Sequence, residues 1–206
     1  YVGYMYGNSD TTLDDARTNA NPSTIKTYID NWYSTNLTSY SKYISTEAVY
    51  CNDRELATGQ TYGTGSGLDL SFFNYAPYGR LYTNNTPTYN CTNNKDAFSG
   101  NNSEAKLTYP IGLMTADEIA YAGGKFGTSL TSPYAWYYLN SAGGSITGST
   151  YWYSLSPIYW YGSFSWVWGV AGSDNTGYLG RNDVLGSLAV RPVISLKSCT
   201  LYSTGN

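Results

Sequence analysis

The chain has 206 residues, and its 11 Lys and Arg residues against 14 Asp and Glu residues give a net charge of −3 at pH 7. It has no basic stripe and no block of like charge, which argues against nucleic acid as a partner. No run of about 18 apolar residues occurs, so we expect no membrane span, and the length suits one domain over residues 1–206.

The polarity of the chain comes from Asn, Ser, Thr, Gly and Tyr, since charged residues make up only 12% of it. This composition is typical of secreted bacterial proteins, so we expect the protein to be secreted or held at the cell surface. The sequence starts inside a strand-like phrase over residues 1–7, from which we expect that a leader or anchor has been removed.

An amphipathic helix is predicted over residues 22–33, with Pro22 in its first turn. Apolar residues recur there at i, i+3, i+4 and i+7, which is the spacing of one helix face. The residues of this stripe are Ile25, Tyr28, Ile29 and Trp32.

A long loop-rich insertion is predicted over residues 51–102, which are rich in Gly, Asn, Thr and Tyr and show little periodicity. Cys51 and Cys91 lie in polar, loop-like settings within it, and we predict a disulfide between them that pins the insertion. Cys199 would then be free or would pair outside the chain. The wide cysteine spacing matches no zinc pattern and the chain has no His, so we expect no metal site.

A second helix is predicted after a capping box at residues 115–118, and the glycines at 123–124 would end it. Strands are predicted over residues 151–156, 164–170 and 189–197, and residues 164–170 alternate with the period of a strand that has two unlike faces. Because the helices are not interleaved with the strands, the element order predicts an α+β fold.

The segment between Lys125 and Lys197 contains five of the six Trp residues and few charges. Tyr and Trp together with Ser, Gly and Asn form the composition of antibody paratopes, which favours a recognition surface. The alternative is that these aromatic residues form the core of a β-rich domain. A buried Tyr needs a partner for its hydroxyl group, which argues against that alternative for the Tyr residues as a set.

The ordered phrases at residues 109–124, 151–157 and 190–196 resemble a family of bacterial surface proteins with a C-type-lectin-like fold. Residues 49–54 and 91–98 are also similar to that family, which includes variable proteins diversified by diversity-generating retroelements. The resemblance implies two helices packed on small antiparallel sheets, with a ligand-binding segment at about 151–190. It also implies surface display and adhesion in place of catalysis.

Retroelement mutagenesis acts on adenines, so Asn codons can become codons for Tyr, Ser, Asp, Gly, Ile, Leu, Phe, Val, Arg, Ala and similar residues, but not for Trp, Lys or Glu. Residues 158–188 fit this range, with Trp160, Trp166 and Trp168 as scaffold exceptions. We expect the binding side chains to be exposed on one contiguous face, while Leu179 and Val184 hold the backbone in the core. The predicted ligand-binding residues are Ile158, Tyr159, Tyr161, Ser163, Phe164, Ser165, Tyr178, Arg181, Asn182, Asp183, Leu185 and Leu188.

Framework roles are predicted for Trp152, Trp168 and Arg191. The chain lacks the Glu-Pro-Asn, Gln-Pro-Asp and Trp-Asn-Asp motifs of true C-type lectins, so we expect no calcium-mediated sugar site and no cofactor. Other acidic and basic residues are interpreted as turn and cap residues, namely Asp53, Arg54, Asp117 and Glu118.

Catalysis is not expected, because the chain has no His, no Gly-x-Ser-x-Gly elbow and no phosphate loop. Asp174 and Asp183 are the only carboxylates of the binding segment, and we interpret them as solvated loop residues rather than a glycosidase pair. The predicted function is recognition of a protein or cell-surface glycan on another cell or phage target by a monomer. The alternative is a pilin-like or filament-forming subunit, which would self-associate.

Overall fold

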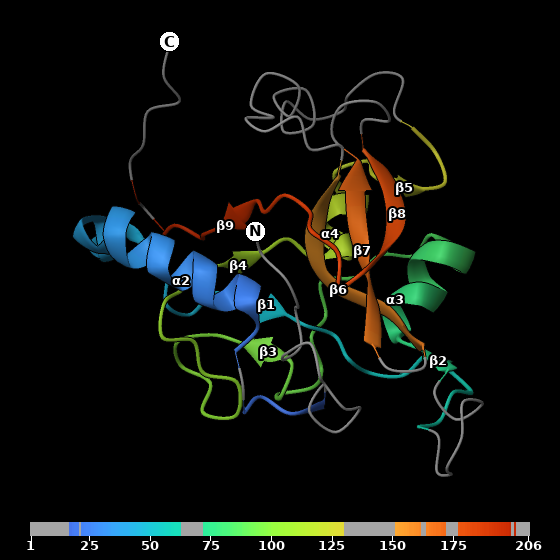
Figure 1. Cartoon of the computed structure of the whole chain (residues 1–206). Coiled ribbons are helices and arrows are strands. Elements are labelled where there is room, and N and C mark those ends of the chain that lie inside the picture. The colour runs from blue at the N-terminus through green and yellow to red at the C-terminus, as the bar shows by residue number, and fades with distance from the viewer. Residues whose placement is uncertain are drawn as a thin grey trace.

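The computed structural model describes residues 17–20, 22–62, 72–129, 151–161, 164–171, 177–198 and 200. They form a mixed α+β fold around a curled sheet (Figure 1). This confirms the predicted fold class, and the predicted strand at residues 1–7 lies outside the described residues. The helices are α2 Thr24–Asn36, η1 Thr38–Tyr43, α3 Ala76–Tyr78, η3 Gly79–Asn84 and α4 Ala116–Tyr121.

The central sheet has five strands in the order β2-β6-β7-β8-β5. Its neighbours are antiparallel, except that β5 runs parallel to β8. Two small antiparallel sheets, β1-β3 and β4-β9, stand beside it. The strands are β1 Tyr50–Cys51, β2 Phe72–Asn74, β3 Ala97–Phe98, β4 Gly112–Leu113, β5 Lys125–Phe126, β6 Tyr151–Tyr161, β7 Phe164–Ala171, β8 Tyr178–Asp183 and β9 Pro192–Val193.

The first predicted helix is confirmed as α2, but its start and its buried stripe differ from the prediction. Ser23 is the N-cap and its hydroxyl accepts a hydrogen bond of 3.1 Å from the Lys26 amide, so Pro22 precedes the helix instead of opening it. Ile25, Ile29 and Tyr33 are buried. The predicted stripe members Tyr28 and Trp32 are exposed, because the helix turns Tyr33 toward the core in place of Trp32.

The capping box of α4 is confirmed. The Glu118 amide donates to the Thr115 hydroxyl at 3.0 Å, and the Glu118 carboxylate accepts from the Thr115 amide at 2.7 Å. These two bonds satisfy backbone donors that the first helical turn leaves without partners.

The predicted strand at 151–156 continues to Tyr161 as β6. Its register against β7 shifts on either side of Pro157, which has no amide hydrogen to give to a ladder. The predicted strand at 189–197 is reduced to β9, with single bridges from Trp152 to Ala189 and from Ile44 to Leu196.

The predicted disulfide between Cys51 and Cys91 is present, with a Cα–Cα distance of 5.8 Å. The loop-rich insertion that it pins contains more regular structure than its sequence predicts, since β2, α3, η3 and β3 all lie within it. Among the described residues, no helix is both long and apolar enough to cross a membrane.

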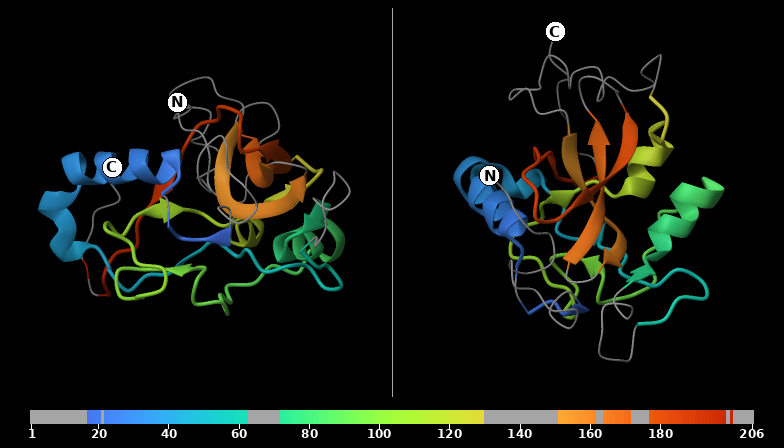
Figure 2. Two further views of the ribbon diagram at one scale, coloured as in Figure 1. Left: turned by 60° about the horizontal axis from the view of Figure 1, so that its bottom comes forward. Right: turned by 45° about the vertical axis from the view of Figure 1, so that its right-hand side comes forward.

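Two core clusters lie on opposite faces of the sheet. On one face, residues such as Trp160 and Val167 pack with Ile29 of α2. On the other face, residues such as Trp168 pack with Leu81 of η3 and Ile119 of α4. Figure 2 shows α2 and the α3–η3 helices on opposite sides of the curled sheet.

Candidate recognition surface

The face of the sheet toward η3 and α4 is only partly covered by these helices. Successive side chains of a strand point to opposite faces, and the register pairs Tyr159 with Trp166 and Trp160 with Ser165. Trp160 therefore enters the core beside α2, whereas Tyr159 and Trp166 point to the other face. They lie beyond the part that the helices bury.

Aromatic side chains continue across this uncovered part, and we call them the aromatic surface. Three of its members are strongly exposed: Phe72 at 51%, Tyr161 at 59% and Tyr82 at 42%. The others are partly exposed. The aromatic surface consists of Phe72, Tyr78, Tyr82, Phe126, Tyr159, Tyr161 and Trp166.

Tyr159 lies at the centre of these ring contacts. Its ring centroid is 5.5 Å from that of Phe72, 5.5 Å from that of Trp166 and 6.5 Å from that of Tyr78. Phe72 in turn lies 6.0 Å from Tyr161, so β2, β6, β7 and α3 each contribute to one continuous set of rings. Phe164 stacks on Trp166 at 6.4 Å and also packs against the core on the other face.

The contacts extend from α3 to the far edge of the sheet. Tyr78 and Tyr82 are stacked with centroids 4.7 Å apart, and Tyr82 lies 4.5 Å from Phe126 of β5. Phe126 meets the buried Trp168 edge-on at 5.7 Å. The buried Trp168 thus supports the aromatic surface from the core.

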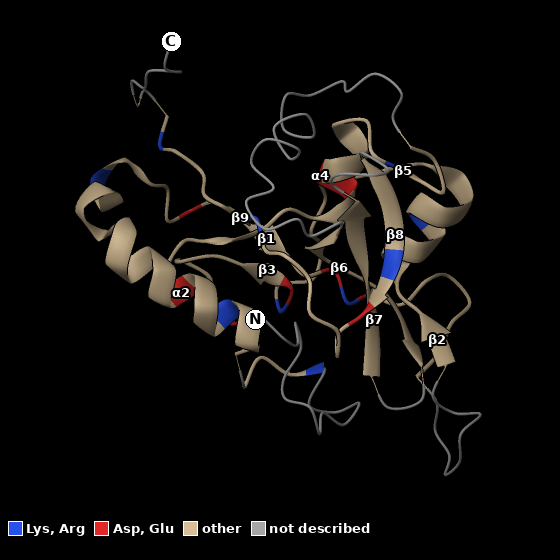
Figure 3. Cartoon of the chain, turned by 45° about the horizontal axis from the view of Figure 1, so that its top comes forward, with Lys and Arg blue, Asp and Glu red and all other residues tan. Residues whose placement is uncertain are grey.

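Arg181 is the cation of the aromatic surface, and it is the single blue segment on β8 in Figure 3. Its side chain is exposed, and its guanidinium carbon lies 6.0 Å from the centroid of the Phe126 ring. Partial burial raises the pKa of Tyr159, and the nearby positive charge of Arg181 opposes the rise. Within the described ranges Arg181 forms no salt bridge.

Most of the predicted ligand-binding residues have solvent-accessible side chains. Tyr161, Arg181 and Leu185 are exposed. Those that are partly exposed are Tyr159, Phe164, Tyr178, Asn182, Asp183 and Leu188. Ser163 lies outside the described residues.

Two of the predicted ligand-binding residues are buried, which corrects the prediction for them. Ile158 is 0% exposed and packs in the core beside η3 and α4, and Ser165 is 2% exposed opposite Trp160. The irregular register near Pro157 and the alternation of β7 direct these side chains inward. Neither can touch a ligand in this conformation.

The exposed residues do not share one contiguous face, contrary to the prediction. Tyr159, Tyr161 and Arg181 come together on the aromatic surface. Asn182 alternates with Arg181 and points to the other face, where its amide nitrogen occupies the space over Gly169. Leu188 packs against the core beside α2, and the Asp183 carboxylate accepts a hydrogen bond of 3.0 Å from the Leu185 amide in a turn.

The sequence did not indicate Phe72, Tyr78, Tyr82 and Phe126, which lie outside the binding segment at 151–190. The available signal was the phrase Phe72–Asn74 followed by Tyr75, which is strand-like but short. Trp166, interpreted as scaffold, is partly exposed and belongs to the aromatic surface. The framework roles of Trp152 and Trp168 agree with their burial, and the Arg191 guanidinium lies 4.9 Å above the Trp152 ring.

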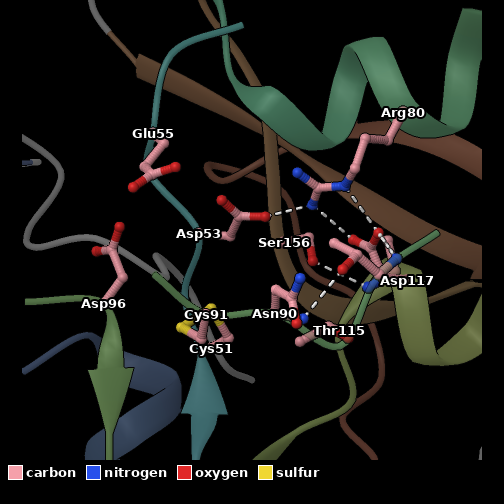
Figure 4. A network of polar contacts seen from close by, with 12 residues as sticks. Cys51, Asp53, Glu55, Arg80, Asn90, Cys91, Asp96, Thr115, Asp117 and Ser156 are labelled. Atoms are coloured by element: carbon pink, nitrogen blue, oxygen red, sulfur yellow. Dashed lines mark hydrogen bonds and ion pairs between the residues drawn. A yellow bond between two sulfur atoms is a disulfide. The ribbon is translucent and has the colours of Figure 1, made fainter. Parts of the chain in front are cut away.

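A polar network fixes the helix that carries Tyr82 (Figure 4). Arg80 binds the carboxylates of Asp53 and Asp117 together, and Asp117 also accepts a hydrogen bond of 2.9 Å from the Thr88 amide. The interpretation of Asp53 and Asp117 as turn and cap residues is therefore incomplete. Asp53 adopts a left-handed backbone conformation with φ 47°, and both carboxylates serve as partners of Arg80.

A second ion pair, between Arg54 and Asp96, is buried. The Arg54 Nε lies 2.6 Å from the Asp96 carboxylate, which also accepts from the Arg54 amide at 2.8 Å. These contacts join the chain segments that follow the two cysteines of the disulfide. In the part of the chain that the structure describes, no group of three or more His, Cys, Asp or Glu residues could hold a metal ion.

Comparisons of this chain with protein-family models, with curated proteins and with solved structures find no match. The function must therefore be argued from the aromatic surface and its surroundings.

Proposed function

We propose that this protein is a ligand-binding protein of the bacterial surface, and that it binds a protein or cell-surface glycan through the aromatic surface. The observation that carries the proposal is the exposure of Phe72, Tyr82 and Tyr161 in one connected set of rings. Exposed apolar patches of this kind mark interaction sites, because a monomer gains nothing by leaving them in water. Tyr, Trp and Arg are also the residues that carry most binding energy in interfaces.

The fold proposed with this function is the C-type-lectin-like fold of the retroelement-diversified proteins that the sequence resembles. The observed α+β class, the two predicted helices and the disulfide support it. Part of the surface, namely Tyr159, Tyr161 and Arg181, lies in the segment proposed to vary. The remaining rings would form a constant border around it.

The surface can be tested by truncating Tyr161 and comparing a matched tyrosine elsewhere. Tyr40 of η1 is 56% exposed against 59% for Tyr161, and it lies outside the aromatic surface. Binding of labelled protein to intact target cells should weaken by a factor of roughly 30 for Tyr161→Ala, as expected for about 2 kcal/mol at a central contact. Tyr40→Ala should bind as the wild type does, and equal binding by both variants would contradict the proposal.

The competing proposal, a filament-forming subunit, uses the same exposed rings for self-association. Sedimentation velocity over a range of protein concentrations separates the two functions. A binding protein stays monomeric, whereas a subunit assembles and Tyr161→Ala reduces its assembly. The encoding locus offers an independent test of diversification, since a near-copy of the codons for residues 158–188 beside a reverse transcriptase gene is expected there.

A further inference from the structure

The guanidinium group of Arg181 lies beside aromatic rings and has no acidic partner among the side chains that the structure describes. It lies 6.0 Å from the centroid of the Phe126 ring and its charge acts on the Tyr159 hydroxyl group, while its Cα partner across the ladder is Trp168. These contacts restrict the side chain to one region of the surface. The contact with Phe126 involves a ring face, so it leaves the five N–H donors of the guanidinium group available.

The described carboxylates of β8 and of the Arg80 network have other partners. Asp183, which follows two residues later in β8, accepts a hydrogen bond from the Leu185 amide. Asp53 and Asp117 both bind Arg80. Arg181 thus adds a positive charge to a largely apolar surface, on a protein whose net charge is −3.

We infer that Arg181 selects a partner protein that presents an Asp or Glu side chain surrounded by apolar residues. This inference rests on the proposed function of the aromatic surface. A carboxylate can accept two parallel hydrogen bonds from a guanidinium group, and the rings around the pair would exclude water and strengthen it. Such a contact discriminates among partners, because an uncharged residue in the same place leaves Arg181 desolvated and without a partner.

The ring geometry favours a protein over a glycan. Phe72 meets Tyr161 at an interplanar angle of 80°, Tyr78 meets Tyr159 at 72° and Tyr82 meets Phe126 at 47°. A sugar ring stacks best on one flat aromatic face, whereas these rings present edges and faces in several directions. Irregular relief of this kind fits the varied side chains of a protein interface.

The test uses a phage-displayed library of short random peptides, selected on the immobilised wild-type protein. Selected peptides should contain Asp or Glu beside aromatic or aliphatic residues. One such peptide is then synthesised with its acid and with the matching amide. Its affinity is measured for the wild type, Arg181→Gln, Arg181→Lys, Tyr161→Ala and the exposed control Lys42→Gln, all shown to fold by circular dichroism.

We expect Arg181→Gln to weaken binding of the acidic peptide about tenfold, the typical effect of one hydrogen bond to a charged group. The amide peptide should lose a similar factor on the wild type and almost nothing further on Arg181→Gln, which shows that the two groups contact each other. The affinity of Arg181→Lys for the acidic peptide should lie between those of the wild type and Arg181→Gln, because lysine keeps the charge but lacks the planar pair of donors. Lys42→Gln should leave binding unchanged.

Two outcomes would overturn the inference and separate it from the proposed function. If the peptides lack acids or bind Arg181→Gln normally while Tyr161→Ala weakens them, the proposed function stands and the role of Arg181 is wrong. If neither variant weakens binding, both proposals fail. Selection of no peptide, together with Arg181-dependent binding to acidic sugars on a glycan array, would replace the protein partner by a glycan.

Discussion

Arg80 and Asp117 are joined by two parallel hydrogen bonds of 2.9 Å, which run from Nε and Nη2 of the guanidinium group to the two carboxylate oxygens. Asp117 lies in the first turn of α4 and its side chain is 4% exposed. The pair therefore ties η3, which carries Tyr82, to α4. One surface ring is thus positioned by an ion pair rather than by apolar packing alone.

Replacement of Arg80 by Met should lower the free energy of unfolding by about 3 kcal/mol, because it leaves the buried Asp117 carboxylate without a cation. Arg80→Lys should cost less, since it keeps the charge but cannot form both parallel bonds. Urea unfolding followed by circular dichroism measures both losses. Lys42→Met, an exposed cation of η1, is the control, and a loss for Arg80→Met no larger than for this control would disprove the anchoring role.

The Cys51–Cys91 disulfide closes a loop with a sequence separation of 40. Cys51→Ser combined with Cys91→Ser should reduce the free energy of unfolding by about 4 kcal/mol on a chain-entropy estimate. Peptide mapping without reductant should recover residues 51 and 91 in one linked fragment. Two free thiols in protein purified under oxidising conditions would contradict the bond.

Gly112 of β4 is in close contact with Tyr50. A Cβ atom at this position would lie 2.5 Å from Cδ1 and 2.8 Å from Cγ of that ring, whose hydroxyl donates to the Pro110 carbonyl at 3.1 Å. Gly112→Ala should therefore destabilise the protein by about 1–3 kcal/mol. Gly79→Ala is the matched substitution, because Gly79 has helical dihedrals and nothing within 4 Å of its Cβ position.

In contrast to Gly112→Ala, Gly79→Ala should be neutral or stabilising by about 0.5–1 kcal/mol. Thermal unfolding of the two variants against the wild type makes the comparison. Equal melting temperatures for the two variants would show that the Tyr50 ring moves away from the added Cβ atom without loss of stability.

Buried Tyr75 should make the protein sensitive to alkaline pH. Burial raises the pKa of Tyr75 above its ordinary value of 10.0. Above pH 10 the unfolded chain therefore loses a proton that the folded protein keeps, so stability is complete below that pH and declines as the pH rises further. Urea unfolding between about pH 8 and pH 11 should show the decline.

Tyr75→Phe should make the decline of the unfolding free energy with pH less steep, by an amount equivalent to the release of up to one proton. Tyr40→Phe, at an exposed position, should not change this decline. The difference between the two variants isolates Tyr75 from the other tyrosines. Parallel pH profiles for the two variants would mean that Tyr75 ionises equally in both states.

Local signals in the sequence were sufficient for α2, α4 and the disulfide. The Thr115 and Glu118 capping box acts within one helical turn, so it can be identified without tertiary information. Strand β8 was not predicted, because Tyr178–Asp183 is a polar, Gly-containing segment that becomes a strand only by pairing with β7. Whether such a segment forms a strand depends more on its tertiary pairing than on its intrinsic strand propensity.

The aromatic surface was only partly predictable for a related reason. Tyr159, Tyr161 and Arg181 share a segment of unusual composition, whereas Phe72 and Tyr82 join them through pairing of β2 with β6 and packing of η3. Residues far apart in sequence cannot be assigned to one face from composition. The predicted exposure of Ile158 and Ser165 was wrong for a different reason. The set of residues that a codon can mutate to does not determine on which side of a strand the side chain lies.

The partial cover of one sheet face and the alternation along β7 separate tolerance to substitution from stability. Arg181 can be exchanged while Leu179, two residues earlier on the same face, remains buried at 0% exposure, and Trp166 can be altered while its neighbour Val167 on the opposite face stays in the core. A combinatorial library confined to the outward positions would thus retain the folded scaffold in most members. Such a library would allow a search for new specificities without redesign of the interior.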